Sequence, residues 1–97
     1  MPVQLRIYTI NRSALDEWAA EWKEKIKPLR LKLGFEILGA WKVEATNQFV
    51  WLLRYDGPES WDTLDKAFHQ SEERRAMEPD PARNIARIEH YFLEPVT

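Results

Sequence analysis

The 97-residue sequence carries a formal net charge of −2 and contains no cysteine. It therefore excludes disulfides and thiolate chemistry, and it argues against nucleic acid as a partner, because phosphate binding requires a concentrated basic surface. Five Trp, four Phe and three Tyr give more aromatic area than a core of this size needs, which predicts either a ligand pocket or a subunit interface.

The N-terminal third of the chain predicts a strand followed by a long helix. In the strand Val3, Leu5, Ile7 and Thr9 alternate with Gln4, Arg6 and Tyr8. The helix is expected to begin after Asn11 or Ser13, either of which can accept a hydrogen bond from an amide of the first turn. Its apolar stripe consists of Leu15, Trp18, Trp22, Ile26, Leu29 and Leu33. Pro28 lies within this stripe, so we expect a kink or two consecutive helices, and Gly34 ends the helix.

The middle of the chain predicts a β-hairpin. Residues 35–44 alternate as a second strand, and a short connection over residues 45–48 leads to the third. The third strand, within residues 47–56, combines β-branched, aromatic and aliphatic side chains and runs into the turn signal Asp56-Gly57-Pro58. The second and third strands should pair with each other.

The C-terminal third predicts a second helix and a last strand. Pro58 is expected at the first position of the helix, whose apolar stripe consists of Trp61, Leu64 and Phe68. Residues 71–84 are the least regular part of the chain, with a turn of helix followed by a loop. The last strand is expected over residues 87–93.

The order of these elements predicts an α+β fold in one domain, residues 1–97. It is a ferredoxin-like βαββαβ arrangement, in which a four-stranded antiparallel sheet carries two helices on one face. If Thr46-Asn47 is a two-residue turn, the helices should cover the face that carries Phe35, Ile37, Trp41, Val43, Val50 and Leu52. The other face would carry Leu38, Ala40, Lys42, Phe49, Trp51, Leu53 and Tyr55. A one-residue difference in the turn would exchange the two faces.

Both faces of the predicted sheet are apolar, whichever of them the helices cover. The face left uncovered is too apolar to remain in water. A second copy of the sheet would cover it, which predicts a homodimer whose two sheets close into a shared barrel, the dimeric α+β barrel.

Several short segments form a pattern that extends over nearly the whole chain. They are Arg6-Ile7-Tyr8, Gly34-Phe35, Trp41, residues 47–56, Trp61 and Ser71-Glu72-Glu73-Arg74. This pattern resembles the NIPSNAP family of the dimeric α+β-barrel superfamily. The resemblance implies a homodimeric barrel and a family whose molecular function is largely uncharacterised. The same superfamily includes cofactor-independent quinol-type monooxygenases, haem-degrading enzymes and small-molecule-binding proteins, so the fold alone selects no function.

Asp65 and His69 on the second helix form the candidate catalytic pair. They are four residues apart, so the carboxylate could orient the ring and raise its basicity, as a general base or an axial haem ligand requires. An exposed helical pair explains the same spacing. The first strand lacks the asparagine that haem-degrading relatives carry, and Asn47 lies at a turn, which weakens the haem alternative. No spacing here indicates a metal site, and no cofactor is expected.

Polar and aromatic side chains of the strands and of the second helix are the candidate ligand-binding residues. They are Arg6, Tyr8, Trp51, Arg54, Tyr55 and Trp61. If an arginine faces a cavity, its planar fork of donors could bind an anionic or phenolic ligand. Alternatively, the arginines form interface ion pairs with Glu36, Glu44 or Glu89, and the aromatic residues are ordinary core. His90 is expected to be a core or interface histidine.

Three functions remain open from the sequence. The first is a homodimer that binds a small apolar or aromatic molecule in a pocket between helices and sheet. The second is a cofactor-independent monooxygenase that acts on a phenolic or quinol substrate with His69 or Tyr8 as its base. The third is a structural or interaction dimer with filled cavities. A cytoplasmic location is expected, because the sequence shows neither a signal-peptide pattern nor an apolar run as long as a membrane span.

Overall fold

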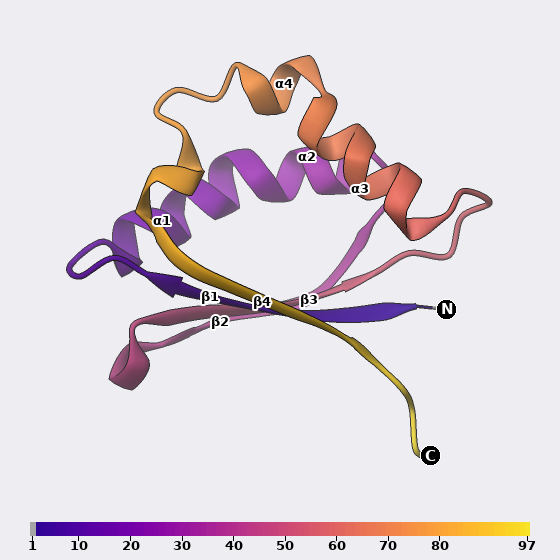
Figure 1. The fold of residues 1–97 in the computed structure, drawn as a ribbon, viewed down its shortest axis with the longest axis horizontal. Helices are drawn as coiled ribbons and strands as arrows, with labels where there is room; N and C mark the ends of the chain where they lie inside the picture. Colours follow the sequence, from indigo (N-terminus) through magenta and orange to yellow (C-terminus); the bar gives the residue numbers. More distant parts are fainter. Residues whose placement is uncertain (1) are drawn as a thin grey trace.

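The computed structural model describes residues 2–97 and shows one antiparallel sheet with helices on one of its faces (Figure 1). The strands are β1 (Val3–Ile10), β2 (Glu36–Val43), β3 (Gln48–Arg54) and β4 (Ile85–Leu93). They lie in the order β2-β3-β1-β4, so β1 and β3 are central and β4 is an edge strand. The predicted ferredoxin-like α+β fold is confirmed.

The first helical region runs along the sheet without a break (Figure 1). It consists of α1 (Leu15–Glu21), a π-helical segment (Trp22–Ile26) and α2 (Lys27–Lys32). Pro28 has no amide hydrogen to donate, and just before it the amide of Lys27 donates to the carbonyl of Trp22, five residues back. Where the sequence predicts a kink or two consecutive helices, the chain instead widens one helical turn and continues.

The predicted cap of this helical region is wrong. Ala14 occupies the N-cap position, and no side chain within residues 2–97 accepts a hydrogen bond from the first turn of α1 there. Ser13 has a left-handed backbone with φ of 66°, so the helix begins one residue later than a Ser13 cap would place it. Asn11 contributes its backbone carbonyl, which accepts from the amide of Ala14 at 3.1 Å.

The second helical region consists of two helices and a 3₁₀ turn. Helix α3 (Trp61–Gln70) is capped by Ser60, whose hydroxyl oxygen accepts a hydrogen bond from the Thr63 amide at 3.1 Å. The predicted start at Pro58 is wrong because Ser60 supplies a side-chain acceptor that proline lacks. A short helix α4 (Glu72–Arg75) and a 3₁₀ turn (Pro81–Asn84) lead into β4. Figure 1 shows α4 farther from the sheet than α2. No helix within residues 2–97 is long and apolar enough to cross a bilayer.

The helices cover the face of the hairpin opposite to the one predicted. Phe49, Trp51, Leu53 and Tyr55 are the residues buried beneath them. The ring of Trp18 lies 4.9 Å from that of Phe49, and the ring of Trp22 lies 5.3 Å from that of Trp51. These large rings fill the space under the helices better than Val50 and Leu52 would, which decides the orientation.

The hairpin connection and the strand register also differ from the prediction. A 3₁₀ turn (Glu44–Thr46) followed by left-handed Asn47 replaces the two-residue turn. Trp41 is opposite Val50 and lies on the same face of the sheet, as the sequence predicted for this pair. The register shifts between Ile37 and Gly39, which places Ile37 opposite Leu53 on the helix side. Phe35, just before β2, is buried against Trp61 and Arg30 of the helices, as predicted.

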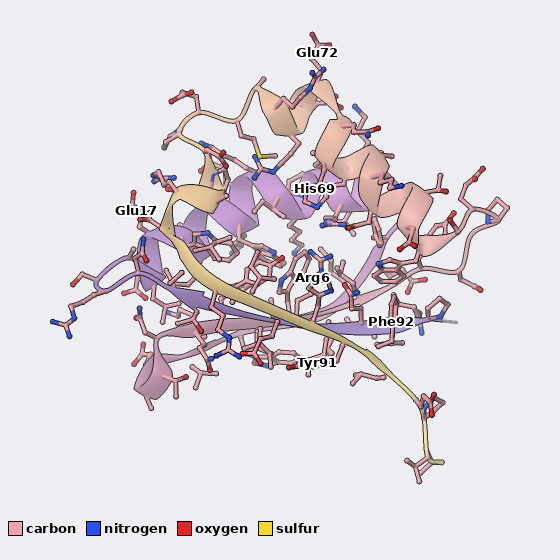
Figure 2. All side chains as sticks on the ribbon, viewed as in Figure 1. Arg6, Glu17, His69, Glu72, Tyr91 and Phe92 are labelled. Atoms are coloured by element: carbon pink, nitrogen blue, oxygen red, sulfur yellow. The ribbon has the colours of Figure 1, made fainter. Side chains whose placement is uncertain are left out.

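The sheet face away from the helices is apolar and uncovered. Strand pairing places on it Val3, Leu5, Ile7, Trp41, Val43, Val50, Leu52, Tyr91 and Leu93, here called the open sheet face. Trp41 is 53% exposed, and Figure 2 shows Tyr91 on the side of the sheet opposite to the helices. A contiguous apolar surface of this kind is typical of protein–protein interaction sites.

Candidate ligand-binding site

A cavity of about 180 Å³ lies between the helices and the sheet. Its apolar wall consists of Trp18, Ile26, Trp51, Phe68, Pro81, Ala82, Ile85 and Ile88, and its polar wall of Arg6, Tyr8, Arg30, Asp65, His69, Arg74 and His90. Ile88 is 50% exposed and the His69 side chain 56% exposed, so the cavity opens between α3 and the edge strand β4. Figure 2 shows Arg6 between the sheet and the helices, with His69 above it on α3.

Arg6 lies at the sheet side of this cavity and is 5% exposed. The alternation of β1 directs it toward the helices together with Gln4 and Tyr8. Its Nε donates to Gln4 Oε1 at 2.7 Å, its Nη1 to the Tyr8 hydroxyl at 2.9 Å, and its Nη2 to Asp65 Oδ1 at 3.2 Å. Gln4 Nε2 in turn lies 3.4 Å from His90 Nδ1 on β4. The guanidinium is therefore fixed by groups on β1 and α3.

Arg30 on α2 is the second buried arginine, and sequence reasoning missed it. It is 1% exposed, and its Nη1 donates to Asp65 Oδ1 at 2.8 Å. Its Cζ lies 3.8 Å from the centroid of the Phe68 ring, a cation–π contact of about 2 kcal/mol in a desolvated setting. Its Nε has no hydrogen-bond partner within residues 2–97. Burial and the charge of Arg6 lower the pKa of Arg30 to about 10, against the opposing effect of Asp65.

Asp65 on α3 is the carboxylate that both arginines share. Burial raises its pKa, but the hydrogen bond from Arg30 and the charges of Arg30 and Arg6 outweigh burial, so the pKa lies below its usual value. The carboxylate is therefore ionised at neutral pH. Arg6, Arg30 and Asp65, here called the arginine cluster, accordingly hold two positive charges and one negative charge.

His69 is placed at the mouth of the cavity with a loose contact to Asp65. Its Nε2 lies 3.7 Å from Asp65 Oδ2, which is longer than a hydrogen bond. Burial lowers the pKa of His69, and the charges of Arg30, Arg6 and Arg74 lower it further, whereas Asp65 raises it. The net effect on basicity is thus opposite to the expected one, and the imidazole is mainly unprotonated at neutral pH.

Two of the predicted ligand-binding residues lie away from the cavity. Arg54 lies beside Val3 at the border of the open sheet face and pairs with Glu36 on the neighbouring strand, within the chain instead of across an interface. The Tyr55 hydroxyl accepts a hydrogen bond from the Glu59 amide at 3.2 Å, and its ring packs against Phe35. Tyr55 therefore anchors the loop before α3.

Trp61 also lies outside the cavity, whereas His90 lies at it. The Trp61 ring packs between those of Phe35 and Phe92, at centroid distances of 5.2 and 5.1 Å. His90 is exposed and lines the cavity, so it is not a core residue, and its expected interface position stays a prediction. Of the predicted site residues, the structure thus brings together Arg6, Tyr8, Trp51, Asp65 and His69. Within residues 2–97 no three His, Asp or Glu side chains form a group that could hold a metal ion.

Comparison with known protein families identifies the chain. The model of the NIPSNAP family matches residues 3–97. The chain belongs to the NIPSNAP family. The resemblance drawn from the aromatic pattern is therefore confirmed. A search of curated proteins found no match.

Solved structures share the fold of this NIPSNAP chain. A NIPSNAP domain protein from Burkholderia xenovorans has a TM-score of 0.84 at 18% identity, over 98% of this chain and 94% of that one. A NIPSNAP family protein from Agrobacterium tumefaciens has 0.85 at 17% identity, over 97% and 91%. A Nitrosomonas europaea protein assigned to the antibiotic biosynthesis monooxygenases has 0.70 at 9% identity, over 100% of both chains. At these identities the likeness shows the fold alone.

The geometry gives the cavity of this NIPSNAP chain two chemical capacities. Guanidinium groups on fixed supports can donate hydrogen bonds to a ligand oxygen, with Trp and Phe rings against the ligand body. An unprotonated imidazole at the mouth can accept a proton. The first capacity depends on buried, tightly held groups and the second on an exposed, loosely held one.

Proposed function

We propose that this NIPSNAP protein binds a small apolar or aromatic molecule in the cavity between helices and sheet. The observation that carries the proposal is the composition of the cavity wall, in which aromatic and aliphatic side chains lie beside polar groups that converge, as in small-molecule sites. The cavity of about 180 Å³ is smaller than the roughly 300–1,000 Å³ of sites for drug-sized ligands. A molecule with a single ring fits that size.

Native mass spectrometry of the protein purified from cells tests this proposal, together with calorimetric titration of one-ring compounds. We expect retained extra mass or saturable binding. Ile88→Trp should abolish either signal, because the larger ring would fill the mouth of the cavity. Gln70→Trp adds the same ring at an exposed α3 position outside the cavity and should change neither. Absence of both signals in the wild type would contradict the proposal.

We also propose that the functional unit is a homodimer formed through the open sheet face. All four strands contribute apolar residues to this face. Two copies of the chain related by a twofold axis can therefore cover each other's open sheet face with the same residues. Light scattering should give twice the mass of the 97-residue chain. A monomer at micromolar concentration would contradict this proposal and leave ligand binding to be judged separately.

A second candidate function is cofactor-independent oxygenation of a phenolic or quinol substrate. The observation in its favour is the unprotonated His69 imidazole at the cavity, in a fold shared with a protein assigned to the monooxygenases. His69 Nε2 would take the phenolic proton, and the phenolate would reduce oxygen. One oxygen atom would enter the ring to give a quinone and the other would leave as water.

Oxygen consumption distinguishes the two candidate functions. The oxygenase would be supported if the wild-type protein turns over a phenol and His69→Ala still binds that phenol but no longer turns it over. Asp65 would then act as a positioning residue, because its carboxylate is held by Arg30 and Arg6 and lies 3.7 Å from His69 Nε2. Unchanged turnover in His69→Ala would exclude this histidine from the reaction.

A further inference from the structure

We propose that the cavity selects a ligand with one negative charge, an aromatic carboxylate or phenolate, and that Arg30 and Arg6 bind the charged group. This inference rests on the ligand-binding function proposed above and specifies the class of ligand. It follows from the balance of charges, from unused hydrogen-bond donors and from the position of the mouth.

The charges that face the cavity do not balance. They belong to Arg6, Arg30, Arg74 and Asp65. Arg74 is neutralised by Asp80, whose Oδ1 lies 3.0 Å from its Nη2. The two remaining guanidiniums share a single oxygen of Asp65, at 3.2 and 2.8 Å. One buried positive charge is left over, and a buried charge is unfavourable unless an opposite charge pairs with it. A monoanionic ligand supplies that charge.

Hydrogen-bond donors at the same place are unused. A guanidinium has five N–H donors, and the hydrogen bond that Arg30 makes to Asp65 uses one on Nη1. The Nε of Arg30 is buried and has no partner within residues 2–97, and the same holds for Nε1 of Trp51. Both residues line the cavity. A carboxylate or phenolate oxygen accepts such hydrogen bonds and donates none, as the site requires.

The aromatic rings around Arg30 do not remove the need for an acceptor. Phe68 and Phe35 lie 3.8 and 5.0 Å from its Cζ, measured to the ring centroids. A ring that covers the face of a guanidinium stabilises its charge, but the N–H donors lie in the guanidinium plane and point past the ring. The rings therefore leave the hydrogen-bonding capacity of the Arg30 Nε unsatisfied.

The depth of the charged groups orients the ligand. Arg30 and Arg6 are buried, whereas Ile88 and His69 at the mouth are half exposed. The charged end of the ligand therefore enters first. Its ring then lies against the apolar wall, which includes Trp18 and Trp51.

Benzoate, benzamide and acetate are suitable probes, because benzamide keeps the ring and loses the charge while acetate keeps the charge and loses the ring. Calorimetric titration of the wild-type protein should show that benzoate binds at least about tenfold more tightly than benzamide and than acetate. Arg30→Gln should remove the preference for benzoate over benzamide. Arg83→Gln changes an arginine that pairs with Glu17 and Glu21 outside the cavity, and it should leave the preference intact.

The outcomes separate this inference from the function on which it rests. If benzamide binds as tightly as benzoate, the pocket exists but the selection of an anion is refuted. If acetate binds as tightly as benzoate, an aromatic ligand is refuted. If no probe binds, ligand binding and the inference fall together. The wild-type comparison needs no variant, so instability of Arg30→Gln would not prevent a decision.

Discussion

Replacement of Asp65 by asparagine should destabilise the protein far more than its partly exposed position suggests. The substitution keeps the size and shape of the side chain and removes one charge. Asp65 Oδ1 is the acceptor of both Arg30 Nη1 at 2.8 Å and Arg6 Nη2 at 3.2 Å. A neutral amide in its place would leave two buried guanidiniums without a counter-charge, and they would repel each other.

The magnitude follows from these contacts. Two unit charges about 4 Å apart attract by about 4 kcal/mol at the effective dielectric constant of a site near the protein surface. The substitution loses two such attractions. Part of this loss is offset, because the buried carboxylate no longer has a desolvation penalty and because the amide keeps neutral hydrogen bonds of about 1 kcal/mol each. The net cost should be about 3–5 kcal/mol, as for other buried pairs that lose one partner. Such a cost is a large fraction of the stability of a domain, which is about 5–15 kcal/mol.

Urea denaturation measures the cost, and Asp16→Asn provides the matched control. Asp16 is exposed and pairs with Lys42 at 2.9 Å, so its loss should cost less than about 1 kcal/mol. Adding Arg30→Gln to Asp65→Asn should recover part of the stability, because one unpaired positive charge is then removed as well. A cost below about 1 kcal/mol for Asp65→Asn, or strict additivity in the double variant, would refute the charge balance deduced for the arginine cluster.

The pH dependence of Asp65→Asn offers a separate check. Because the folded pKa of Asp65 is lowered, its stabilisation is present above the unfolded pKa of about 3.9 and is lost as the pH falls through the folded pKa. The difference in stability between wild type and Asp65→Asn should therefore be constant near neutral pH and shrink in acid. A difference that persists unchanged in acid would have another cause.

Three other perturbations address the dimer, the hairpin and the cavity mouth. Trp41→Glu on the open sheet face should shift the species seen by light scattering from dimer to monomer, whereas Glu72→Lys on α4 should not. Asn47→Ala should cost about 2–3 kcal/mol in urea denaturation, because Asn47 is left-handed and donates to two backbone carbonyls at 2.6 and 3.0 Å. The lowered pKa of His69 means that the unfolded chain binds its proton more readily, so stability should fall as the pH drops below about 6.5, and His69→Gln should weaken that fall.

The fold could be predicted from the sequence because periodicity identifies elements, but periodicity does not say which face a strand buries. In β3 both alternating sets are apolar, Phe49 with Trp51 on one side and Val50 with Leu52 on the other. The orientation is decided by packing between β3 and the rings of Trp18 and Trp22, which lie far apart from it in the sequence. A local pattern carries no signal of that contact.

The site could be predicted from two kinds of signal, a polar residue that interrupts an apolar strand and the four-residue spacing of Asp65 and His69 on a helix. Arg6 and Tyr8 stand out in the first way on β1, and both line the cavity. Arg30 does not stand out, because an arginine beside lysines on a helix resembles a solvated face. One signal was available: Arg30 lies four residues after Ile26 and eight after Trp22, so it continues their stripe. Arg54 also interrupts an apolar strand, but it forms an ion pair at the sheet surface and does not line the cavity. The sequence pattern alone does not distinguish these two positions.

Two anchors hold the segment from α3 to the 3₁₀ turn over the cavity. At one end Trp61 packs between the rings of Phe35 and Phe92, and at the other Trp18 Nε1 donates to the Pro81 carbonyl at 2.9 Å. Between these points α4 stays away from the sheet (Figure 1). The framework thus maintains the cavity through contacts that need no ligand. A ligand that enters between α3 and β4 therefore meets positioned arginines, and its affinity is not reduced by the cost of ordering the site.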